Sequence, residues 1–380
     1  MTRSKKSFGT TRRLASGRWQ ARYQDLDGLR RAAPLTFASR VDAERWLSNT
    51  ERDLLDRKWI DPDGGTVLLD QWAPRWLKSR VDLKPTTQAS YESLMRNHII
   101  PAFGRRQIAR IRPTDVQEWV AHLSNEGRSS SQVRQLSNLL GVMLKSAVAD
   151  GLIPNNPCES VRLPRARHRE VNFFTAAQIE DLAAAIRSPY HVLIYVLAYG
   201  GLRYGEASAL RRNDSELARG RLRIDESLAE VNGHLHFGTT KTHQTRFVTL
   251  PPFLCELVAR HLDERVGLEP EALVFTSPQG QPLRYGAFYR RSWLPALRAA
   301  GLPPSGMHSL RHTCASLLIA HGAPIKAVQA QLGHQSAELT LDRYGHLYPD
   351  QMDILAERLE EARRHARSPA GRTRVNDRTE

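Results

Sequence analysis

Apolar and polar side chains alternate along the first part of the chain, the pattern of β-strands with one face turned to a core. Residues 17–24 follow this alternation, Asp27-Gly28 is a strong turn signal, and residues 34–37 can form a returning strand. The pattern therefore predicts a small antiparallel sheet of three strands near the N-terminus.

A helical period replaces the alternation after this sheet. Apolar residues recur at near-helical spacing in residues 39–58, and Ser39 or Asp42 is placed to cap the first turn. The cluster Asp-Pro-Asp-Gly-Gly at 61–65 then interrupts every regular pattern. We expect a first domain, residues 1–61, made of a small β-sheet plus a helix.

The next part of the chain has only helical periodicity. Apolar stripes that follow Pro or Ser predict helices, and the longest of them ends at Gly151. The predicted helices begin near residues 67, 86, 113 and 129. They form an all-α bundle over residues 66–157, which a basic, proline-containing linker follows over residues 158–172.

From residue 173 the pattern is mixed. Thr175 is placed to cap a helix, and short strands are predicted at 222–224 and 273–275. Residues after the second strand are expected to be helical as far as Tyr344. The third domain, residues 173–350, is therefore predicted to be mainly α with a small antiparallel sheet.

A polar stretch lies between two alternating segments of this third domain. The segments are residues 235–237 and 246–250, and Lys241 lies between them. This pattern predicts a β-hairpin with Lys241 at its turn.

The last part, residues 351–380, begins with one more amphipathic pattern. Apolar residues between 352 and 364 predict a helix, and the polar, basic residues 363–380 are expected to be disordered in isolation. Taken together, the patterns predict an α+β multidomain chain.

The net charge of the chain indicates what kind of partner it binds. The chain has 380 residues, with 55 Lys and Arg against 40 Asp and Glu, a formal net charge of +15 and a pI near 10.2. Such an excess is typical of a protein that binds a polyanion. A membrane surface also attracts basic charge, but the sequence has neither a run of 18 apolar residues nor an amphipathic tail rich in aromatic residues.

Cysteine use and the N-terminus bear on the compartment. The chain has three cysteines, Cys158, Cys255 and Cys314. Because their number is odd, their spacing is wide and no two form a CxxC pair, neither a disulfide framework nor a structural zinc site is predicted. The first residues are charged but lack the apolar segment of a secretory signal. We expect a protein of the bacterial cytoplasm, associated with the nucleoid.

Polar residues of chemical interest interrupt the last helices of the third domain. His308, Arg311 and His312 share one helix face, because positions i, i+3 and i+4 are neighbours. His334 follows the next helix stop, and Tyr344 comes ten residues later. Cationic and neutral donors around a single phenol predict a phosphoryl-transfer site, where donors hold the equatorial oxygens and the hydroxyl attacks in line.

Such a site needs a second guanidinium group. The charge of a pentavalent phosphate is spread over two non-bridging oxygens, for which bidentate guanidinium is the best partner. Arg203 lies in the glycine-rich stretch Gly-Leu-Arg-Tyr-Gly-Glu before a new helix, and Lys241 adds a further cation.

Five motifs in this order resemble the tyrosine recombinase, or phage integrase, family. They are Gly-Leu-Arg-Tyr-Gly-Glu, the hairpin lysine, His-Ser-Leu-Arg-His, Leu-Gly-His and Leu-Asp-Arg-Tyr-Gly-His. The resemblance implies the DNA breaking-rejoining fold for residues from about 173 to 350. It further implies that the first domain is an arm-type DNA-binding domain and that the helical bundle is a core-binding domain of the SAM-like kind.

The resemblance also implies roles for single residues. Arg203 and Arg311 would clamp the scissile phosphate, and Lys241 would protonate the leaving 5′ oxygen. His308 would act as an acid or base near the nucleophile, and His334 would add a hydrogen bond to the phosphate.

The nucleophile implied by the resemblance is Tyr344, and Glu206 would order the site without reacting. A 3′-phosphotyrosyl bond stores the energy for rejoining, so no metal or other cofactor is expected. The implied substrate is duplex DNA at core and arm sites, and the reaction integrates or excises a mobile element such as a prophage or an integrative plasmid. Further implied partners are a homotetramer of this chain on DNA, an excision or directionality factor and a host DNA-bending protein.

Other interpretations stay open at this point. Each residue taken singly also fits a packed or solvated side chain, and for His312 packing is the preferred interpretation. Tyr348 is a rival phenol outside the motif. A zinc site at His308 and His312 is disfavoured, because Ser309 stands where metalloproteases have glutamate.

Two alternative functions also remain. One is a relaxing enzyme similar to type IB topoisomerases, and the other is a DNA-binding protein that has kept the fold without the reaction. A protein that only binds could dispense with Tyr344, Arg203 and Arg311, and their presence favours an enzyme.

Overall fold

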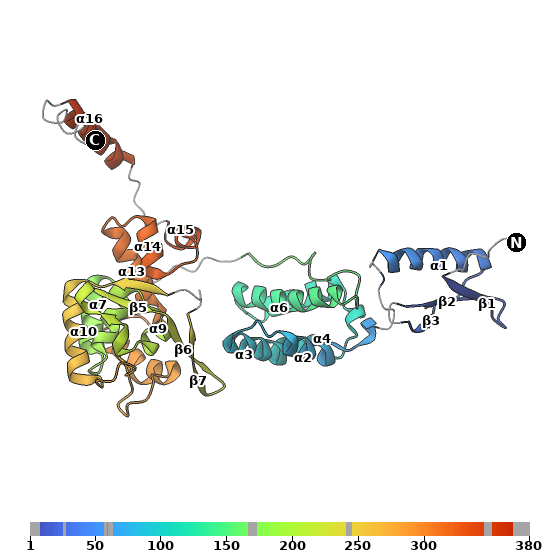
Figure 1. Ribbon diagram of the computed structural model, residues 1–380, viewed down its shortest axis with the longest axis horizontal. Helices are drawn as coiled ribbons and strands as arrows, with labels where there is room; N and C mark the ends of the chain where they lie inside the picture. The colour runs from blue at the N-terminus through green and yellow to red at the C-terminus, as the bar shows by residue number, and fades with distance from the viewer. Residues whose placement is uncertain are drawn as a thin grey trace, which may run out of the picture. The chain divides into compact units, whose positions relative to one another are not determined.

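The computed structural model describes residues 8–25, 28–56, 59, 64–165, 173–240, 245–345 and 352–367. Helices alternate with small antiparallel sheets, as the patterns predict (Figure 1). The chain divides into two compact units, residues 1–168 and 169–380. Each is described by itself.

The first unit opens with an antiparallel sheet in the order β1-β2-β3, formed by β1 (Gly9–Arg13), β2 (Trp19–Gln24) and β3 (Arg30–Ala32). Alternation along β2 buries Ala21 and Tyr23 against α1 (Arg40–Leu55). Ser39 caps this helix, since its hydroxyl accepts a hydrogen bond of 3.1 Å from the Asp42 backbone.

The returning strand lies earlier than the sequence predicts. β3 pairs with β2 in a register that sets Arg22 opposite Ala32, and the turn closes through Gly28, whose φ is +80°. In the predicted segment 34–37, only Phe37 bridges to Trp19. The predicted strand begins with Pro34, and a proline cannot donate a hydrogen bond to a ladder.

The helical part of this unit has a core of its own. Its helices are α2 (Leu69–Ser79), α3 (Pro85–Leu94), α4 (Ile100–Phe103), α5 (Pro113–Asn125) and α6 (Ser130–Ala149), with a π-helical turn at Met95–Ile99 between α3 and α4. The predicted helical patterns are confirmed, including proline at the first turns of α3 and α5. Beyond α6 the chain continues to pack on this core through Cys158, Val161 and Leu163.

The second unit is mainly helical. Its helices are α7 (Ala176–Ala185), α8 (His191–Gly200), α9 (Tyr204–Ala209), α10 (Pro252–Arg265), α11 (Tyr285–Phe288), α12 (Leu294–Ala299), α13 (His308–Ala320), α14 (Ile325–Leu332), α15 (Ala337–Tyr344) and α16 (Met352–Arg367), with a π-helical turn at Tyr289–Trp293. α8 is apolar all round, and α7, α10 and α13 pack on it. It is the central helix of the core, and its C-terminal end leads into the candidate site.

Two small sheets lie beside these helices. β4 (Ser215–Glu216), β5 (Arg221–Ile224) and β8 (Arg246–Thr249) form one, and β6 (Glu226–Val231) and β7 (His234–Thr239) form the other. The strand predicted at 222–224 is confirmed. The strand predicted at 273–275 is wrong: Leu273 makes a single bridge to Arg211, while Val274 and Phe275 are buried as core residues.

The predicted hairpin is also wrong in its pairing. β7 pairs with β6 through the two-residue turn Asn232-Gly233, at φ +50° and +80°, whereas β8 pairs with β5 in the other sheet. Asn-Gly is the strongest short hairpin signal because both residues tolerate positive φ. Lys241 belongs to the connection from β7 to β8 and lies outside the described residues.

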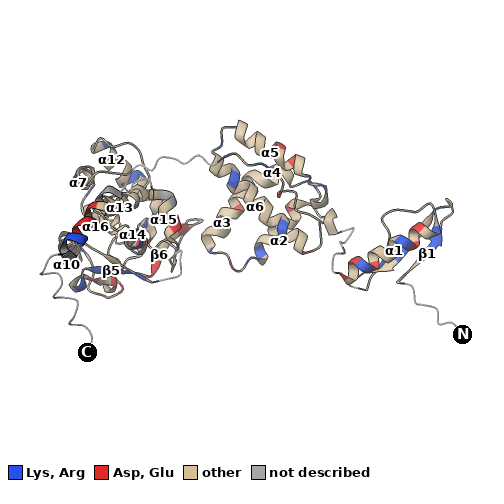
Figure 2. Cartoon of the chain, turned by 90° about the horizontal axis from the view of Figure 1, so that it is seen from above, with Lys and Arg blue, Asp and Glu red and all other residues tan. Residues whose placement is uncertain are grey.

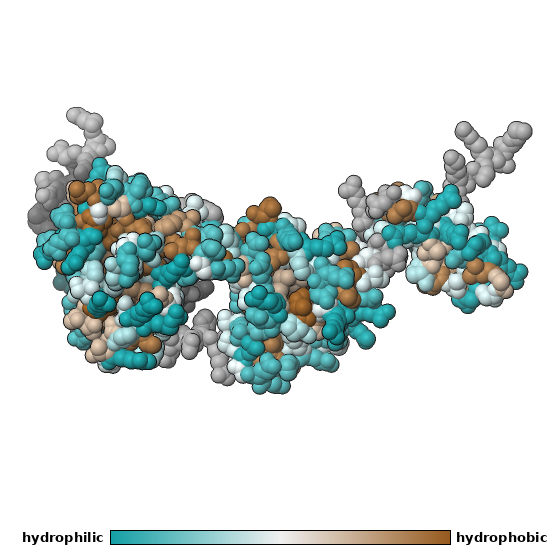
Figure 3. All heavy atoms as spheres, turned by 90° about the horizontal axis from the view of Figure 1, so that it is seen from below, coloured by the Kyte–Doolittle hydropathy of each residue, from teal (hydrophilic) through white to brown (hydrophobic). Residues whose placement is uncertain are grey.

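Apolar side chains at the surface are interspersed with hydrophilic ones in the view of Figure 3. Within the described ranges, no helix is both long and apolar enough to cross a membrane.

α16 extends to Arg367, three residues beyond the predicted end, and Leu359 on it is 70% exposed.

Candidate active site

A tight turn between α8 and α9 carries the first arginine. α8 ends at Gly200, and the capping residue Gly201 has a φ of +71°, the left-handed conformation typical of a helix C-terminus. A Cβ atom there would lie 2.7 Å from Leu332 and 2.9 Å from Cys314, so a larger residue would push the neighbouring helices apart. The glycine thus lets the chain turn within the core and place Arg203 at the N-cap of α9.

Glu206 holds two arginines. Its carboxylate accepts hydrogen bonds of 2.7 Å from the Arg203 guanidinium and 2.6 and 3.1 Å from that of Arg246. Burial raises the pKa of Glu206, but the hydrogen bonds and charges of Arg246 and Arg203 outweigh this and lower it to about 2. The buried carboxylate is therefore ionised and fixes both guanidinium groups.

Arg311 is 1% exposed and connects three segments of the chain. Its guanidinium donates to the Gly201 carbonyl at 2.7 Å and to the Leu332 carbonyl at 2.5 Å. Burial and then the positive charge of Arg203 lower the pKa of Arg311 to about 9, so the group is still charged at neutral pH. The buried guanidinium of Arg311 and the half-buried one of Arg203 repel each other, which favours the binding of an anion near them.

His334 follows Gly333, which ends α14 with a φ of +65°. A Cβ on Gly333 would lie 2.6 Å from the Arg246 side chain, so this turn lies directly against the arginine that holds Glu206. The His334 Nδ1 is 2.9 Å from the hydroxyl of Thr340, which is fully buried in α15. When that hydroxyl donates, the neutral ring carries its proton on Nε2 and can donate a hydrogen bond from that nitrogen.

Tyr344 is the last residue of α15 and is 1% exposed. Its ring stacks on His334 at 6.4 Å between centroids, and its hydroxyl is 2.5 Å from the Nδ1 of His312. His308, the first residue of α13, packs edge to face against His312 at 4.7 Å. Three histidines and the phenol thus form one cluster.

The predicted site residues come together as far as the structure describes them. Arg203, Glu206 and Arg311 are linked through the α8–α9 turn. His334 stacks on Tyr344, whereas His308 is connected to Tyr344 only through the ring of His312. Although the sequence presents Arg311 and Tyr344 as polar residues that interrupt apolar helices, both are among the largest fully buried side chains. They can be buried because backbone carbonyls and a histidine supply polar partners.

The sequence does not reveal three residues of the site. For His312 the preferred interpretation from the sequence is packing, and no motif points to Arg246 or Thr340. The only sequence signal for Arg246 is its place at the start of an alternating strand, which says nothing about a partner 40 residues earlier. Thr340 has no signal at all, because its role depends on how α15 folds back toward His334.

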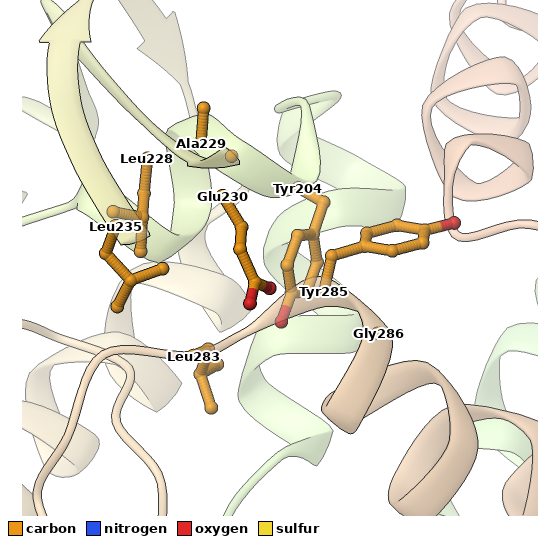
Figure 4. A pocket seen from close by; sticks show the side chains of 9 residues that line it. Tyr204, Leu228, Ala229, Glu230, Leu235, Leu283, Tyr285 and Gly286 are labelled. Atoms are coloured by element: carbon orange, nitrogen blue, oxygen red, sulfur yellow. The ribbon is translucent and has the colours of Figure 1, made fainter. Parts of the chain in front are cut away.

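A pocket of about 390 Å³ adjoins the α9 turn. It lies between the β6–β7 hairpin and α11, and Figure 4 shows the rings of Tyr204 and Tyr285 with the carboxylate of Glu230 around it. Burial raises the pKa of Tyr204, whose ring packs edge to face on Tyr285. This packing anchors the residue that follows Arg203.

No group of three or more His, Cys, Asp or Glu that could hold a metal ion occurs within the part of the chain that the structure describes.

Arg246→Ala should lower the free energy of unfolding by about 3 to 5 kcal/mol, because it leaves a buried carboxylate short of its bidentate partner. The measurement is urea unfolding at pH 7. Arg284→Ala is the matched control: Arg284 pairs with Glu230 at 2.5 Å but is 43% exposed, so its loss should cost no more than about 1 kcal/mol. Equal effects of the two variants would contradict a structural role of the buried pair.

Acid should also remove the stability that the ionised Glu206 gains from its pairing with Arg246. A glutamate in an unfolded chain has a pKa of about 4.3, whereas that of Glu206 is about 2. A lowered carboxylate pKa stabilises the fold fully above the unfolded value and no longer does so once the pH falls through the folded value. The gain in stability between pH 2 and 4.3 should therefore be smaller in Arg246→Ala than in the unchanged protein, as measured by unfolding curves across this range.

Comparison with known proteins adds to this geometry. The phage integrase family matches residues 172–351, the N-terminal SAM-like domain of phage integrases matches residues 68–124, and the N-terminal domain of phage integrases matches residues 7–57. The chain is 33% identical over 353 residues to the phiRv2 prophage integrase of Mycobacterium tuberculosis, an overlap of 90% of this chain and 92% of the relative.

Solved structures with the same fold include DNA complexes. The integrase of transposon Tn1549 bound to transposon right end DNA superposes with a TM-score of 0.67 at 22% identity, over 77% of this chain and 100% of that one. A lambda integrase tetramer bound to a Holliday junction gives 0.56 at 19% identity, over 88% and 97% of the two chains. The predicted fold class, with its small sheets and helical parts, is confirmed.

Proposed function

Because the chain belongs to the phage integrase family and is a site-specific tyrosine recombinase, we propose that Tyr344 is its nucleophile. The observation that carries the proposal is the convergence of separate motifs on this one phenol. Arg311 bonds the carbonyls of Gly201 and Leu332, and the ring of His334 stacks on Tyr344. Residues up to 143 positions apart in sequence thereby share one buried site.

In this proposal Arg203 and Arg311 bind the scissile phosphate. Arg203 and Arg311 each present a guanidinium group to the scissile phosphate, and they stabilise the charge that develops on its non-bridging oxygens. Glu206 keeps Arg203 in place through a hydrogen bond of 2.7 Å. His334 donates a further hydrogen bond from Nε2, with Thr340 selecting the tautomer.

Proton transfer completes the reaction. Lys241, predicted from the sequence and outside the described residues, protonates the leaving 5′ oxygen. The resemblance gives His308 an acid or base role near the nucleophile, and its ring packs against His312, which contacts the Tyr344 hydroxyl. The resulting 3′-phosphotyrosyl bond stores the energy for rejoining, so the reaction needs neither ATP nor a metal ion.

The substrate in this proposal is duplex DNA at paired attachment sites. The helical bundle binds the core site together with the catalytic unit, and the small N-terminal sheet binds a separate arm site. The solved lambda integrase tetramer on a Holliday junction supports assembly of four copies on DNA. A directionality factor, a host DNA-bending protein and a cytoplasmic location belong to the same proposal.

A suicide DNA substrate, nicked so that the cleaved end diffuses away, tests the proposal. Single-turnover incubation should trap a covalent protein–DNA adduct. Joining between two DNA duplexes then distinguishes a recombinase from a relaxing enzyme similar to type IB topoisomerases. Binding without any adduct would point instead to a DNA-binding relative that has lost the reaction.

The exposed face of the N-terminal sheet supports the arm-site assignment. Arg12, Arg22 and Arg30 share that face, opposite the buried Ala21 and Tyr23. Figure 2 shows the basic residues of β1 and α1. Strands in this arrangement can enter a DNA groove and neutralise phosphates.

Removing residues 1–61 should therefore spare the chemistry and abolish recombination. The segment has 14 Lys or Arg and 8 Asp or Glu, a net charge of +6, and its core is separate from those of the other domains. The truncated protein should form adducts on a short core site but fail to recombine full-length attachment sites. The salt dependence of its binding to long DNA should also become shallower, because fewer phosphates are neutralised.

Gel-shift titrations at several salt concentrations measure this slope. An unchanged slope together with normal recombination would show that the sheet is not a DNA-binding module.

A further inference from the structure

The hydroxyl of Tyr344 has a partner that the motif does not assign. The Nδ1 of His312 lies 2.5 Å from the phenol oxygen, and the two ring centroids are 5.7 Å apart at an angle of 60°. His312 is half-buried in the second turn of α13, while Tyr344 is 1% exposed. This contact brings together residues 32 positions apart in sequence.

Attack by a phenol at neutral pH needs a proton acceptor. A free tyrosine ionises near pH 10 and a free histidine near 6.5. Between a phenol and an unprotonated imidazole nitrogen, the phenol is the hydrogen-bond donor. Burial also disfavours a free phenolate. A neutral imidazole in contact with the hydroxyl is therefore suited to take the proton as the oxygen attacks.

We propose that His312 is the general base for Tyr344, an inference that rests on the proposed function of this site. As the phenol oxygen bonds to phosphorus, its proton moves to Nδ1 of His312, which becomes an imidazolium. The bond from phosphorus to the 5′ oxygen breaks, and that oxygen takes a proton from the general acid. In rejoining, the 5′ hydroxyl returns its proton to the group that served as general acid while its oxygen attacks phosphorus. The bond from phosphorus to the phenol oxygen breaks, and Nδ1 returns its proton to Tyr344.

The surroundings of His312 fit this exchange. His308 on the same helix packs against its ring, and Tyr344 faces it from α15. His334 stacks on Tyr344, and Arg311 precedes His312 in the chain. His308 therefore positions the base, whereas His312 contacts the reacting oxygen itself.

The test is the pH dependence of single-turnover adduct formation on a suicide substrate between pH 5.5 and 9. In the unchanged protein the rate should rise as an imidazole loses its proton and then level off. His312→Asn keeps an acceptor near the position of Nδ1 but cannot take a proton. It should lower the rate at pH 7 by about 10², and the rate should then climb about tenfold per pH unit without levelling off.

His308→Asn is the matched control, because it makes the same change one helical turn earlier. It should keep the levelling of the profile, whatever its effect on the rate. Loss of that levelling in His308→Asn, with the normal profile kept in His312→Asn, would overturn the proposal and make His308 the base. A uniform loss at every pH in His312→Asn would also overturn it, because that is the result expected of a packing residue.

Two further measurements keep the outcome interpretable. Thermal unfolding and DNA affinity of His312→Asn show whether the variant folds, and His312→Gln repeats the profile if the asparagine variant does not. Tyr344→Phe separates this inference from the proposed function. Adduct formation by Tyr344→Phe would defeat both, whereas its absence together with a normal profile in His312→Asn would defeat the base assignment alone.

Discussion

Replacing Tyr344 by phenylalanine should abolish the covalent protein–DNA adduct while leaving DNA affinity nearly unchanged. The substitution removes one oxygen atom, so the ring can still stack on His334, and the phosphate contacts that dominate affinity remain. Without the hydroxyl no phosphotyrosyl bond can form. Denaturing electrophoresis of a suicide-substrate reaction measures the adduct, and a filter-binding titration measures the affinity.

Tyr348→Phe is the matched control for this prediction. Tyr348 is the rival phenol in the sequence and lies outside the described residues. Its variant should form the adduct at the normal rate. An adduct that persists in Tyr344→Phe and disappears in Tyr348→Phe would move the nucleophile by four residues and end the assignment made here.

The sequence was informative where local rules decide the structure. Thr175 caps α7, Pro113 opens α5, and Gly333 ends α14 in the left-handed conformation. Each of these signals depends only on a few neighbouring residues. The position of His334 after its helix stop could be predicted for the same reason.

Strand pairing was less predictable, because alternation identifies a strand but not its neighbour. The segments at 235–237 and 246–250 were interpreted as one hairpin, yet they belong to different sheets. The Asn232-Gly233 turn pairs β7 with β6, the strand before it. Pairing of β8 with β5 closes a loop of more than 20 residues, which no local pattern reveals.

Contacts within the site depend on tertiary structure even more. The motifs predicted that Arg203, Arg311 and Tyr344 act together. The structure shows which side chains hold the residues of the site in place. Arg246 in strand β8 reaches Glu206 in helix α9, and His312 in α13 reaches Tyr344 in α15. A polar side chain buried in a core can be identified only when its partner is known, since burial without a partner would be costly.

Arg311→Ala should lower the rate of DNA cleavage by about 10² or more, because in the proposed mechanism it removes a transition-state partner of the phosphate. Cleavage by Arg311→Lys should also be strongly impaired, since an ammonium group keeps the charge but cannot make the bidentate contact of a guanidinium group. Both variants should still bind DNA, because most of the affinity comes from other phosphate contacts. Single-turnover cleavage at saturating protein separates the chemical step from binding.

Loss of stability must be separated from loss of catalysis in these variants, because Arg311 also donates to the carbonyls of Gly201 and Leu332. Arg212 offers the matched control. Its guanidinium donates to the carbonyls of Leu262 and Gly267 at 2.5 and 2.7 Å, and it belongs to the same unit but not to the site. Arg212→Ala should lower the melting temperature and leave cleavage by the folded protein unchanged. If Arg212→Ala and Arg311→Ala slow cleavage equally at equal melting temperature, Arg311 acts only as a structural residue and a different cation must hold the phosphate.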